Sequence, residues 1–244
     1  MFAGSTASLA VLAAPDLVLL TLTEFAEQAR RITRAMDIPL IVDADHGYGN
    51  ALNVMRTVEE LETAGVAALT VEDTELPSAF GARGPRLIPI EEGAGKMRAA
   101  IAARSDSALV IVGRTSAPSV TGMDDAVRRC RAYEAAGVDA VFLSGIRTRA
   151  DLETLCAEVS VPVLLGALSD ELQDVQYLSA TGVRIGLQGH LPIRAAMRAM
   201  YDTMKALRDG IPPAQIGGLP SPATTDRLVR SDDYRRWTED YTHG

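Results

Sequence analysis

The sequence predicts an α/β protein of the (β/α)8 TIM-barrel type, and two observations lead to that fold class. A helical pattern ending in a small residue and Gly-Val, followed by an apolar run, occurs three times, within 63–73, 135–145 and 180–189. Polar residues follow at least five of the apolar runs along the chain. Alternating helices and buried strands form parallel sheets, and a barrel collects its chemistry from many strand ends on one rim.

Six apolar runs are expected to form the strands, taken in order at 39–45, within 63–73, at 108–116, within 135–145, at 161–169 and within 180–189. The first five residues, MFAGS, supply a fragment of one more strand. A closed barrel needs eight strands. We therefore expect a barrel that lacks its N-terminal strand and helix and leaves strand edges unpaired.

Helices are expected before three of these strands, over LNVMRTVEELETAG, MDDAVRRCRAYEAAG and ELQDVQYLSATG. Each of these segments ends on a glycine, which suits a helix C-cap. The competing architecture is a doubly wound sheet, which carries a glycine-rich fingerprint after its first strand. No G-x-G-x-x-G pattern follows the first strand here, so the barrel is favoured.

The chain is expected to divide into a barrel domain over 1–208 and a C-terminal extension over 209–244. Residues 209–232 are rich in proline, glycine and serine and are typical of an extended linker. The segment DYRRWTEDY after it predicts a short helix with Trp237 and Tyr241 on one face. This helix is expected to pack either on its own barrel or on a neighbouring subunit.

Composition narrows the class of protein. Of 244 residues, 47% are hydrophobic. The 24 basic and 32 acidic residues give a net charge of −8. The basic residues form no cluster, which argues against nucleic-acid binding. No apolar run reaches the length of a membrane span, and the N-terminus lacks the basic start of a signal peptide. The two cysteines, Cys130 and Cys156, lie in helical patterns, which excludes a disulfide framework and favours a cytoplasmic protein.

The segment PLIVDADHGYGN places Asp43 and Asp45 two positions apart at the end of a strand, where we expect both on one face. Like charges so close repel unless a positive group lies beside them. A divalent metal would be one such group; solvated aspartates before a turn are the alternative. Glu72 ends the next strand, and an all-carboxylate set favours Mg2+ or Mn2+ over zinc.

Two further residues suit the same rim. Arg114 ends another strand and offers a planar fork for a substrate carboxylate, or it pairs structurally with the acids. His190 follows the last strand and either faces the site or caps the helix that begins at LPIRAAM. A cation beside an arginine that binds a carboxylate suits a site for a 2-oxo acid, because the cation draws negative charge from the keto oxygen.

The motifs DADHGYGN, VEDTELPSAFG and GRTSA resemble the phosphoenolpyruvate mutase/isocitrate lyase superfamily, and most closely its oxaloacetate decarboxylase branch. The resemblance implies a Mg2+-dependent barrel, with Mn2+ as a substitute, in a homo-oligomer that exchanges C-terminal helices, either a dimer or a homotetramer. It implies that Asp43 holds the metal and that Asp45 and Glu72 help directly or through water.

The resemblance also implies the residues that contact a small 2-oxo acid. Ser5, with nearby backbone amides, would contact the substrate carboxylate, and Arg114 would clamp it. His190 would line the pocket and Asp16 would lie at its rim.

Three departures from the family pattern bear on the substrate. The stretch ELPSAFGARGPRLIPIEEG lacks the cysteine of the lyase loop, which disfavours cleavage of isocitrate or methylisocitrate. Ala167 and Ser116 stand where the decarboxylase branch has tyrosine and asparagine. The expected reaction is decarboxylation of oxaloacetate, or a related 2-oxo dicarboxylate, to pyruvate and CO2. The alternatives are a phosphonopyruvate mutase or hydrolase, a 2-methylisocitrate-type lyase, and a truncated inactive paralogue with an assembly role.

Overall fold

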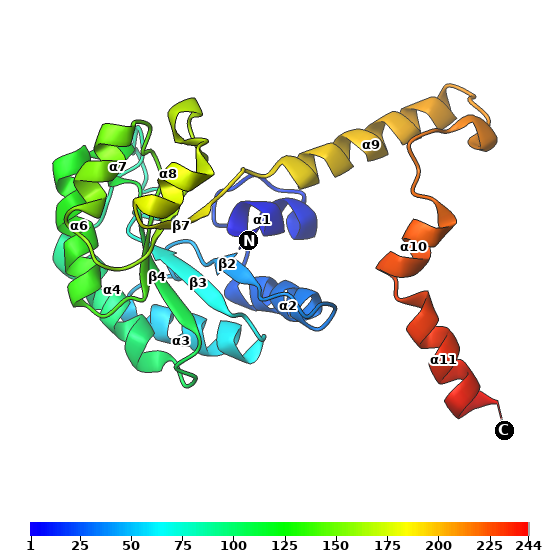
Figure 1. Ribbon diagram of the computed structural model, residues 1–244, viewed down its shortest axis with the longest axis horizontal. Helices are drawn as coiled ribbons and strands as arrows, with labels where there is room; N and C mark the ends of the chain where they lie inside the picture. Colours follow the sequence, from blue (N-terminus) through cyan, green and yellow to red (C-terminus); the bar gives the residue numbers. More distant parts are fainter. Residues whose placement is uncertain (244) are drawn as a thin grey trace. The chain divides into compact units, whose positions relative to one another are not determined.

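Seven parallel strands form a single curled sheet in the computed structural model, which describes residues 1–243 (Figure 1). The strands follow one another in sequence order, and each pairs with the next. They are β1 (Phe2–Ala3), β2 (Ile41–Asp43), β3 (Ala68–Glu72), β4 (Val110–Thr115), β5 (Ala140–Leu143), β6 (Val163–Leu165) and β7 (Val183–Gly186). Among the described residues β1 does not pair with β7, so the sheet is an open barrel and the predicted fold class is confirmed.

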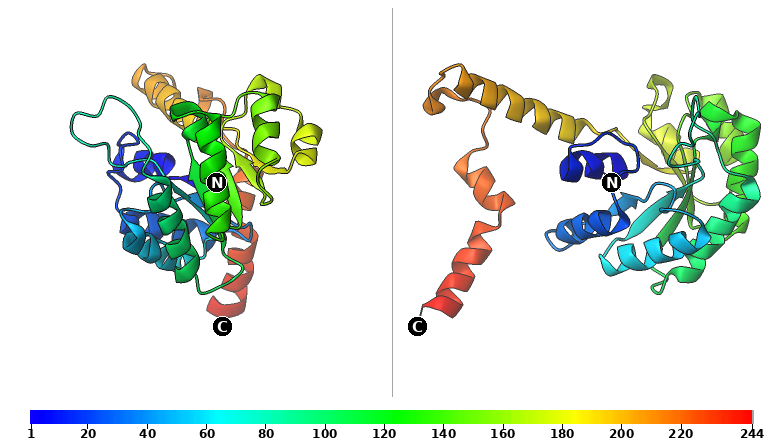
Figure 2. Two further views of the ribbon diagram at one scale, coloured as in Figure 1. Left: turned by 90° about the vertical axis from the view of Figure 1, so that its left-hand side faces the viewer. Right: turned by 180° about the vertical axis from the view of Figure 1, so that it is seen from behind.

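Helices cover the convex side of the sheet, as Figure 2 shows from two further directions. The helices of this part of the chain are α1 (Gly4–Leu12), α2 (Leu22–Thr33), α3 (Ala51–Thr63), α4 (Ile90–Ala103), α5 (Ala117–Val120), α6 (Met123–Ala135), α7 (Arg149–Cys156) and α8 (Val175–Ala180), with a 3-10 turn at Asp170–Leu172. The predicted cap glycines Gly65, Gly137 and Gly182 follow α3, α6 and α8 with φ values of 79°, 97° and 97°. Glycine adopts this left-handed conformation without steric cost, which lets each helix turn into the following strand.

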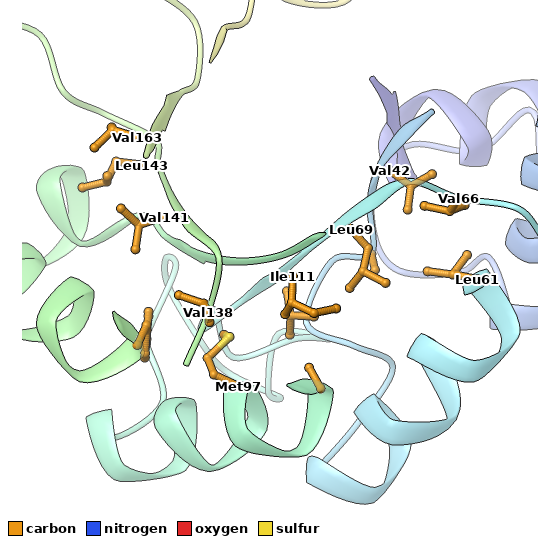
Figure 3. Close-up of a cluster of buried hydrophobic side chains, with 14 of the residues drawn as sticks. Val42, Leu61, Val66, Leu69, Met97, Ile111, Val138, Val141, Leu143 and Val163 are labelled. Atoms are coloured by element: carbon orange, nitrogen blue, oxygen red, sulfur yellow. The ribbon is translucent and has the colours of Figure 1, made fainter. Parts of the chain in front are cut away.

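The main hydrophobic core lies between the sheet and these helices (Figure 3). Val42, Leu69 and Ile111 from three neighbouring strands are fully buried there, against Leu61 of α3 and Met97 of α4. A smaller cluster on the other face of the sheet consists of Val112, Ala140, Phe142 and Leu164. Apolar side chains on both faces are typical of parallel strands, and they leave the strand ends as the place for polar chemistry.

The chain from His190 onward forms a second compact unit, separate from Met1–Gly189. It contains α9 (Leu191–Arg208), a 3-10 turn at Pro213–Gln215, α10 (Pro222–Leu228) and α11 (Ser231–Thr242). The extended linker expected over 209–232 is therefore wrong at α10, where the Ser221 side chain accepts a hydrogen bond from the Thr224 amide and Pro222 starts the helix. The domain boundary at residue 208 stays a prediction.

The helix predicted around Trp237 and Tyr241 is confirmed as α11. None of the helices in the described part of the chain combines the length and the apolar character of a membrane span.

Candidate active site at the strand ends

Asp43 is the last residue of β2, and its side chain is held from the neighbouring strand. The hydroxyl of Thr70 on β3, itself fully buried, donates a hydrogen bond of 2.9 Å to Asp43 Oδ1. Asp43 and Thr70 are also register partners in the sheet. The carboxylate therefore has a fixed orientation at the rim, and the predicted position of Asp43 at a strand end is confirmed.

Asp45 does not lie on the same strand face as Asp43, because β2 ends at Asp43. Asp45 lies in the turn that follows, at φ 48°, and Gly47 and Tyr48 have φ values of 77° and 60°. The argument from side-chain alternation along a strand is thus wrong. A run of left-handed backbone brings the second carboxylate to the site instead.

Side chains from two helices fix this turn. The buried Lys96 of α4 donates a hydrogen bond of 2.9 Å to the His46 carbonyl, and the Thr57 hydroxyl of α3 donates one of 3.1 Å to the Gly47 carbonyl. Lys96 and Thr57 therefore hold the backbone of this turn through the His46 and Gly47 carbonyls. Burial lowers the pKa of His46 to about 4, assisted by the charge of Lys96, so its imidazole is neutral at pH 7.

The carboxylate of Asp45 lies against the start of α1. A Cβ atom added to Gly4 would come 2.4 Å from Asp45 Oδ2, so only glycine leaves room for this approach. The N-terminus of a helix carries free amide groups and a partial positive charge, which favours an anion. Ser5 lies in the same first turn, and Asp16 lies close enough for its charge to raise the pKa of Asp45.

Arg114 of β4 lies between two of the predicted acids. Its Nη1 donates a hydrogen bond to Asp43 Oδ2, and its Nε is 3.2 Å from Glu72 Oε2. Glu72 and Arg114 are register partners on β3 and β4, which explains their proximity. The guanidinium also lies 5.1 Å from the centre of the Phe142 ring. The ion pair considered for Arg114 is therefore present, whereas its role as a substrate clamp stays a prediction.

Negative charge exceeds positive charge at this rim. Burial, reinforced by Asp43 and Glu72, raises the pKa of the Asp45 carboxyl to about 8. Burial also raises the pKa of Glu72 to about 6, although the charge of Arg114 opposes the rise. Burial alone would lower the pKa of Arg114, but the charges of Asp43 and Glu72 outweigh burial and raise this pKa above its usual range. One guanidinium therefore faces a cluster of buried carboxyl groups that a second cation would stabilise.

The donor set fits a hard divalent cation. Within residues 1–243, no three Asp, Glu, His or Cys side chains are arranged as a complete set of metal ligands. Mg2+ does not need such a set, since it keeps several waters and uses one or two carboxylates. Asp43 and Glu72 are oxygen donors only 8% and 6% exposed. The residues present thus match a partly hydrated Mg2+ or Mn2+ ion.

Three other residues singled out in the sequence follow β4, β6 and β7 along the chain. Ser116 directly follows β4 as the residue before α5, and Ala167 lies two positions after β6. His190 occupies the N-cap position of α9 in the second unit, and its side chain does not cap that helix. The capping role considered for His190 is therefore wrong, whereas its role in the pocket stays a prediction.

The structure adds buried polar residues behind the site. Asp73 is fully buried and accepts hydrogen bonds from Tyr133 Oη at 2.6 Å and from Arg129 Nη1 at 3.0 Å, both on α6. Lys96 is only 3% exposed. The sequence does carry a signal for Lys96 and Arg129, because each interrupts the apolar stripe of its helix, next to Met97 and Cys130 respectively.

The chain matches a known family over most of its length. The model of the family described as phosphoenolpyruvate phosphomutase matches residues 1–208. The chain is 55% identical over 241 residues to an oxaloacetate decarboxylase of Bradyrhizobium sp. (strain ORS 278), covering 99% of this chain and 84% of that protein. It is 58% identical over 230 residues to an oxaloacetate decarboxylase of Bradyrhizobium diazoefficiens, covering 94% of this chain and 80% of that protein.

Solved structures share the architecture. A phosphonopyruvate hydrolase in complex with oxalate and Mg2+ superposes with a TM-score of 0.86 at 32% identity, covering 99% of this chain and 86% of that one. An oxaloacetate acetylhydrolase in complex with the inhibitor 3,3-difluorooxalacetate gives a TM-score of 0.84 at 26% identity, covering 99% and 84%.

Proposed function

We propose that this chain, which belongs to the phosphoenolpyruvate phosphomutase family, decarboxylates oxaloacetate to pyruvate and CO2 with a divalent cation. One observation carries the proposal: buried carboxylates share a single arginine at the strand ends, in a chain more than half identical to oxaloacetate decarboxylases. The carboxylates provide for a cation, and the arginine provides for the carboxylate of a 2-oxo acid.

Asp43 would hold the cation, with Asp45 and Glu72 as direct or water-mediated partners. When bound, the cation would supply Lewis-acid chemistry, stabilising the negative charge that develops on the keto oxygen as CO2 leaves. Thr70 keeps the Asp43 carboxylate oriented for this task through its hydrogen bond of 2.9 Å. Mg2+ is the proposed ion because every candidate ligand is an oxygen atom.

Binding and orientation of the substrate fall to the chain's own cationic and amide groups. Arg114 offers a planar pair of donors to the carboxylate beside the keto group. The first turn of α1, which includes Ser5, offers backbone amides to the same end of the molecule. Asp16, whose charge reaches Asp45, is proposed for the rim of the pocket.

The distal carboxylate leaves as CO2, and its electron pair passes into the enolate of pyruvate. The enolate carbon then takes a proton from water or from His190. Poor solvation of the distal carboxylate would favour the loss of CO2. Ala167 and Ser116, which differ from the decarboxylase pattern, are proposed to shape this distal part of the pocket.

A panel of substrates tests the assignment. With Mg2+ present, we expect the rate of pyruvate release from oxaloacetate to be at least about a hundredfold higher than the rate of pyruvate release from phosphonopyruvate or 2-methylisocitrate. Faster turnover of phosphonopyruvate would instead assign the chain to the phosphonate branch represented by the hydrolase structure. A folded protein inactive on all three compounds would support an assembly role.

A cytoplasmic homo-oligomer, a dimer or tetramer, completes the proposal. No residue of α9 is buried within the described chain, and Met197, Met200, Tyr201 and Met204 are exposed at helical spacing. A contiguous apolar stripe of this kind is typical of an interface. Light scattering of the purified protein should give the mass of a dimer or tetramer, and the double change Met200→Glu and Met204→Glu should lower it.

A further inference from the structure

The loop between β3 and α4, residues 74–87, leaves the sheet two positions after Glu72 and projects from the strand ends in the left-hand view of Figure 2. Phe80 within it is fully exposed. Its two ends are joined by an antiparallel bridge between Thr74 and Leu87 and by a bidentate pair in which Arg86 contacts Glu75 at 2.8 and 3.1 Å. The loop is therefore a closed hairpin-like excursion whose base adjoins the candidate site.

Arg129 of α6 lies under that base and contacts both sides of it. One nitrogen, Nη1, donates to Asp73 Oδ2 at 3.0 Å and to the Ile88 carbonyl at 2.9 Å. The Ile88 amide in turn donates to the Asp73 carbonyl at 2.9 Å. A single buried guanidinium thus joins the residue just before the loop to the residue just after it.

The other contacts of Arg129 keep its guanidinium in place. Its Nε donates to Asp125 Oδ2 at 2.7 Å, and the Thr121 hydroxyl donates to the same oxygen at 2.7 Å. Tyr133, one turn further along α6, donates to Asp73 Oδ2 at 2.6 Å. Arg129 and Asp125 are 6% and 8% exposed, so solvent weakens these contacts little.

Movement at Asp73 would be transmitted to the site. Asp73 is covalently adjacent to Glu72, and its amide donates to the Arg114 carbonyl at 3.3 Å. Glu72 and Arg114 are register partners, and their side chains lie 3.2 Å apart. The position of Asp73 therefore sets how Glu72 faces Arg114.

We propose that Arg129 is a positioning residue of the active site: from α6 it clamps both ends of loop 74–87 and thereby keeps Glu72 in place beside Arg114. Arg129 is not among the residues proposed to contact the substrate or the cation, and its side chain bonds to Asp125, Asp73 and the Ile88 carbonyl. Its role for the reaction rests on the proposed decarboxylase function, whereas the clamp on the loop does not. The two parts therefore need separate readouts.

The test compares Arg129→Lys with Arg128→Lys. Lysine keeps the charge, but one ammonium group cannot replace the guanidinium fork that serves Asp125, Asp73 and the Ile88 carbonyl together. Arg128 is a matched control, since it contacts the same Asp125 at 2.9 Å while its side chain is 63% exposed. Chymotrypsin cleavage at Phe80 in the folded protein, followed by mass spectrometry, measures how firmly the loop is held.

For R129K we expect cleavage at Phe80 to accelerate at least about tenfold and kcat/KM for oxaloacetate to fall at least about tenfold, with R128K equal to wild type on both. A purely structural role would lower the melting temperature of R129K without moving either quantity. Cleavage of R129K at the wild-type rate would overturn the proposal. If the wild-type protein fails to decarboxylate oxaloacetate, the proposed function is refuted, and the cleavage rates still decide the clamp.

Tyr133→Phe keeps the test decisive if R129K does not fold. This change removes the Tyr133 hydroxyl, which donates a hydrogen bond of 2.6 Å to Asp73 and also interacts with Arg129, while the guanidinium of Arg129 itself is kept. We expect cleavage at Phe80 to accelerate by a smaller factor, about threefold, because Arg129 still joins the loop ends. Cleavage and kcat/KM both equal to wild type in Y133F would overturn the proposal in that case.

Discussion

Arg114 is hydrogen-bonded to Asp43 at the rim of the sheet, although 71 positions separate the two residues in the sequence. The pair means that a guanidinium and a divalent cation would share one carboxylate. Binding of the cation to Asp43 would weaken the hold of Asp43 on Arg114 and make the guanidinium fork available to a substrate carboxylate. Cation binding and substrate binding would therefore be linked through the single side chain of Asp43.

Replacing Arg114 by glutamine should strengthen the binding of Mg2+ and weaken the turnover of oxaloacetate. Removing the competing positive charge should tighten Mg2+ binding about tenfold, as measured by calorimetry. Loss of the carboxylate clamp should nevertheless lower kcat/KM for oxaloacetate at least about a hundredfold. If Arg114→Gln weakened Mg2+ binding as strongly as it weakened turnover, Arg114 would be a structural support for the acids only.

Thr70→Val tests the support of Asp43, the carboxylate that we propose for the metal. Valine has nearly the shape of threonine, so the fold should persist, but Asp43 loses the hydrogen bond that orients it. Loss of such a supporting partner typically lowers metal affinity about 10- to 100-fold. The apparent dissociation constant for Mg2+ should rise by that factor, and an unchanged constant would show that the hydroxyl does not support a metal ligand.

Gly4→Ala tests the close approach of α1 to Asp45. An added Cβ would lie 2.4 Å from Asp45 Oδ2, so the carboxylate has to move. We expect Mg2+ affinity to fall about tenfold while the protein remains folded. Gly95→Ala in α4 is the control, because the nearest atom to its Cβ would be 3.8 Å away and alanine favours a helix. Equal Mg2+ affinity in the two variants would contradict this placement of Asp45.

The sequence predicts the polar rim of the sheet well, because strand ends and helix ends depend on residues close together in the chain. Apolar runs mark the strands and glycines such as Gly65 mark the helix ends, so parallel strands must bring Asp43 and Glu72 to one edge. Asp45 reaches the same rim through the left-handed turn after β2. The alternation of side chains along a strand does not reveal such a turn. α10 carried a local signal in Ser221 and Pro222 that the proline- and glycine-rich composition around it obscured.

The supports of the site could not be predicted from the sequence. Lys96 reaches the His46 carbonyl across 50 positions, and Arg129 reaches Asp73 across 56. A charged residue in the apolar stripe of a helix indicates that a buried partner exists. It does not say which partner, because that depends on how the helices pack on the sheet.

The cysteines should be inert in the folded protein. Burial raises the pKa of the Cys130 thiol to about 12, so this thiol remains protonated near pH 8, and burial also raises the pKa of Cys156. In a Cys156→Ser variant, labelling of Cys130 by a disulfide reagent should be roughly a thousandfold slower than in the denatured chain and should accelerate with rising pH. Labelling at the denatured rate would show that α6 does not bury this thiol.

The central claim is that Asp43 holds a cation that this protein needs in order to release CO2 from oxaloacetate. Pyruvate formation should be measured with Mg2+, after chelation with EDTA, and with Asp43→Asn in Mg2+, each beside the same solution without protein, because free metal ions decarboxylate oxaloacetate slowly. We predict rapid pyruvate release only from the wild-type protein with Mg2+, and rates equal to the matching protein-free controls in the other two reactions. Full activity in EDTA or in Asp43→Asn would contradict it.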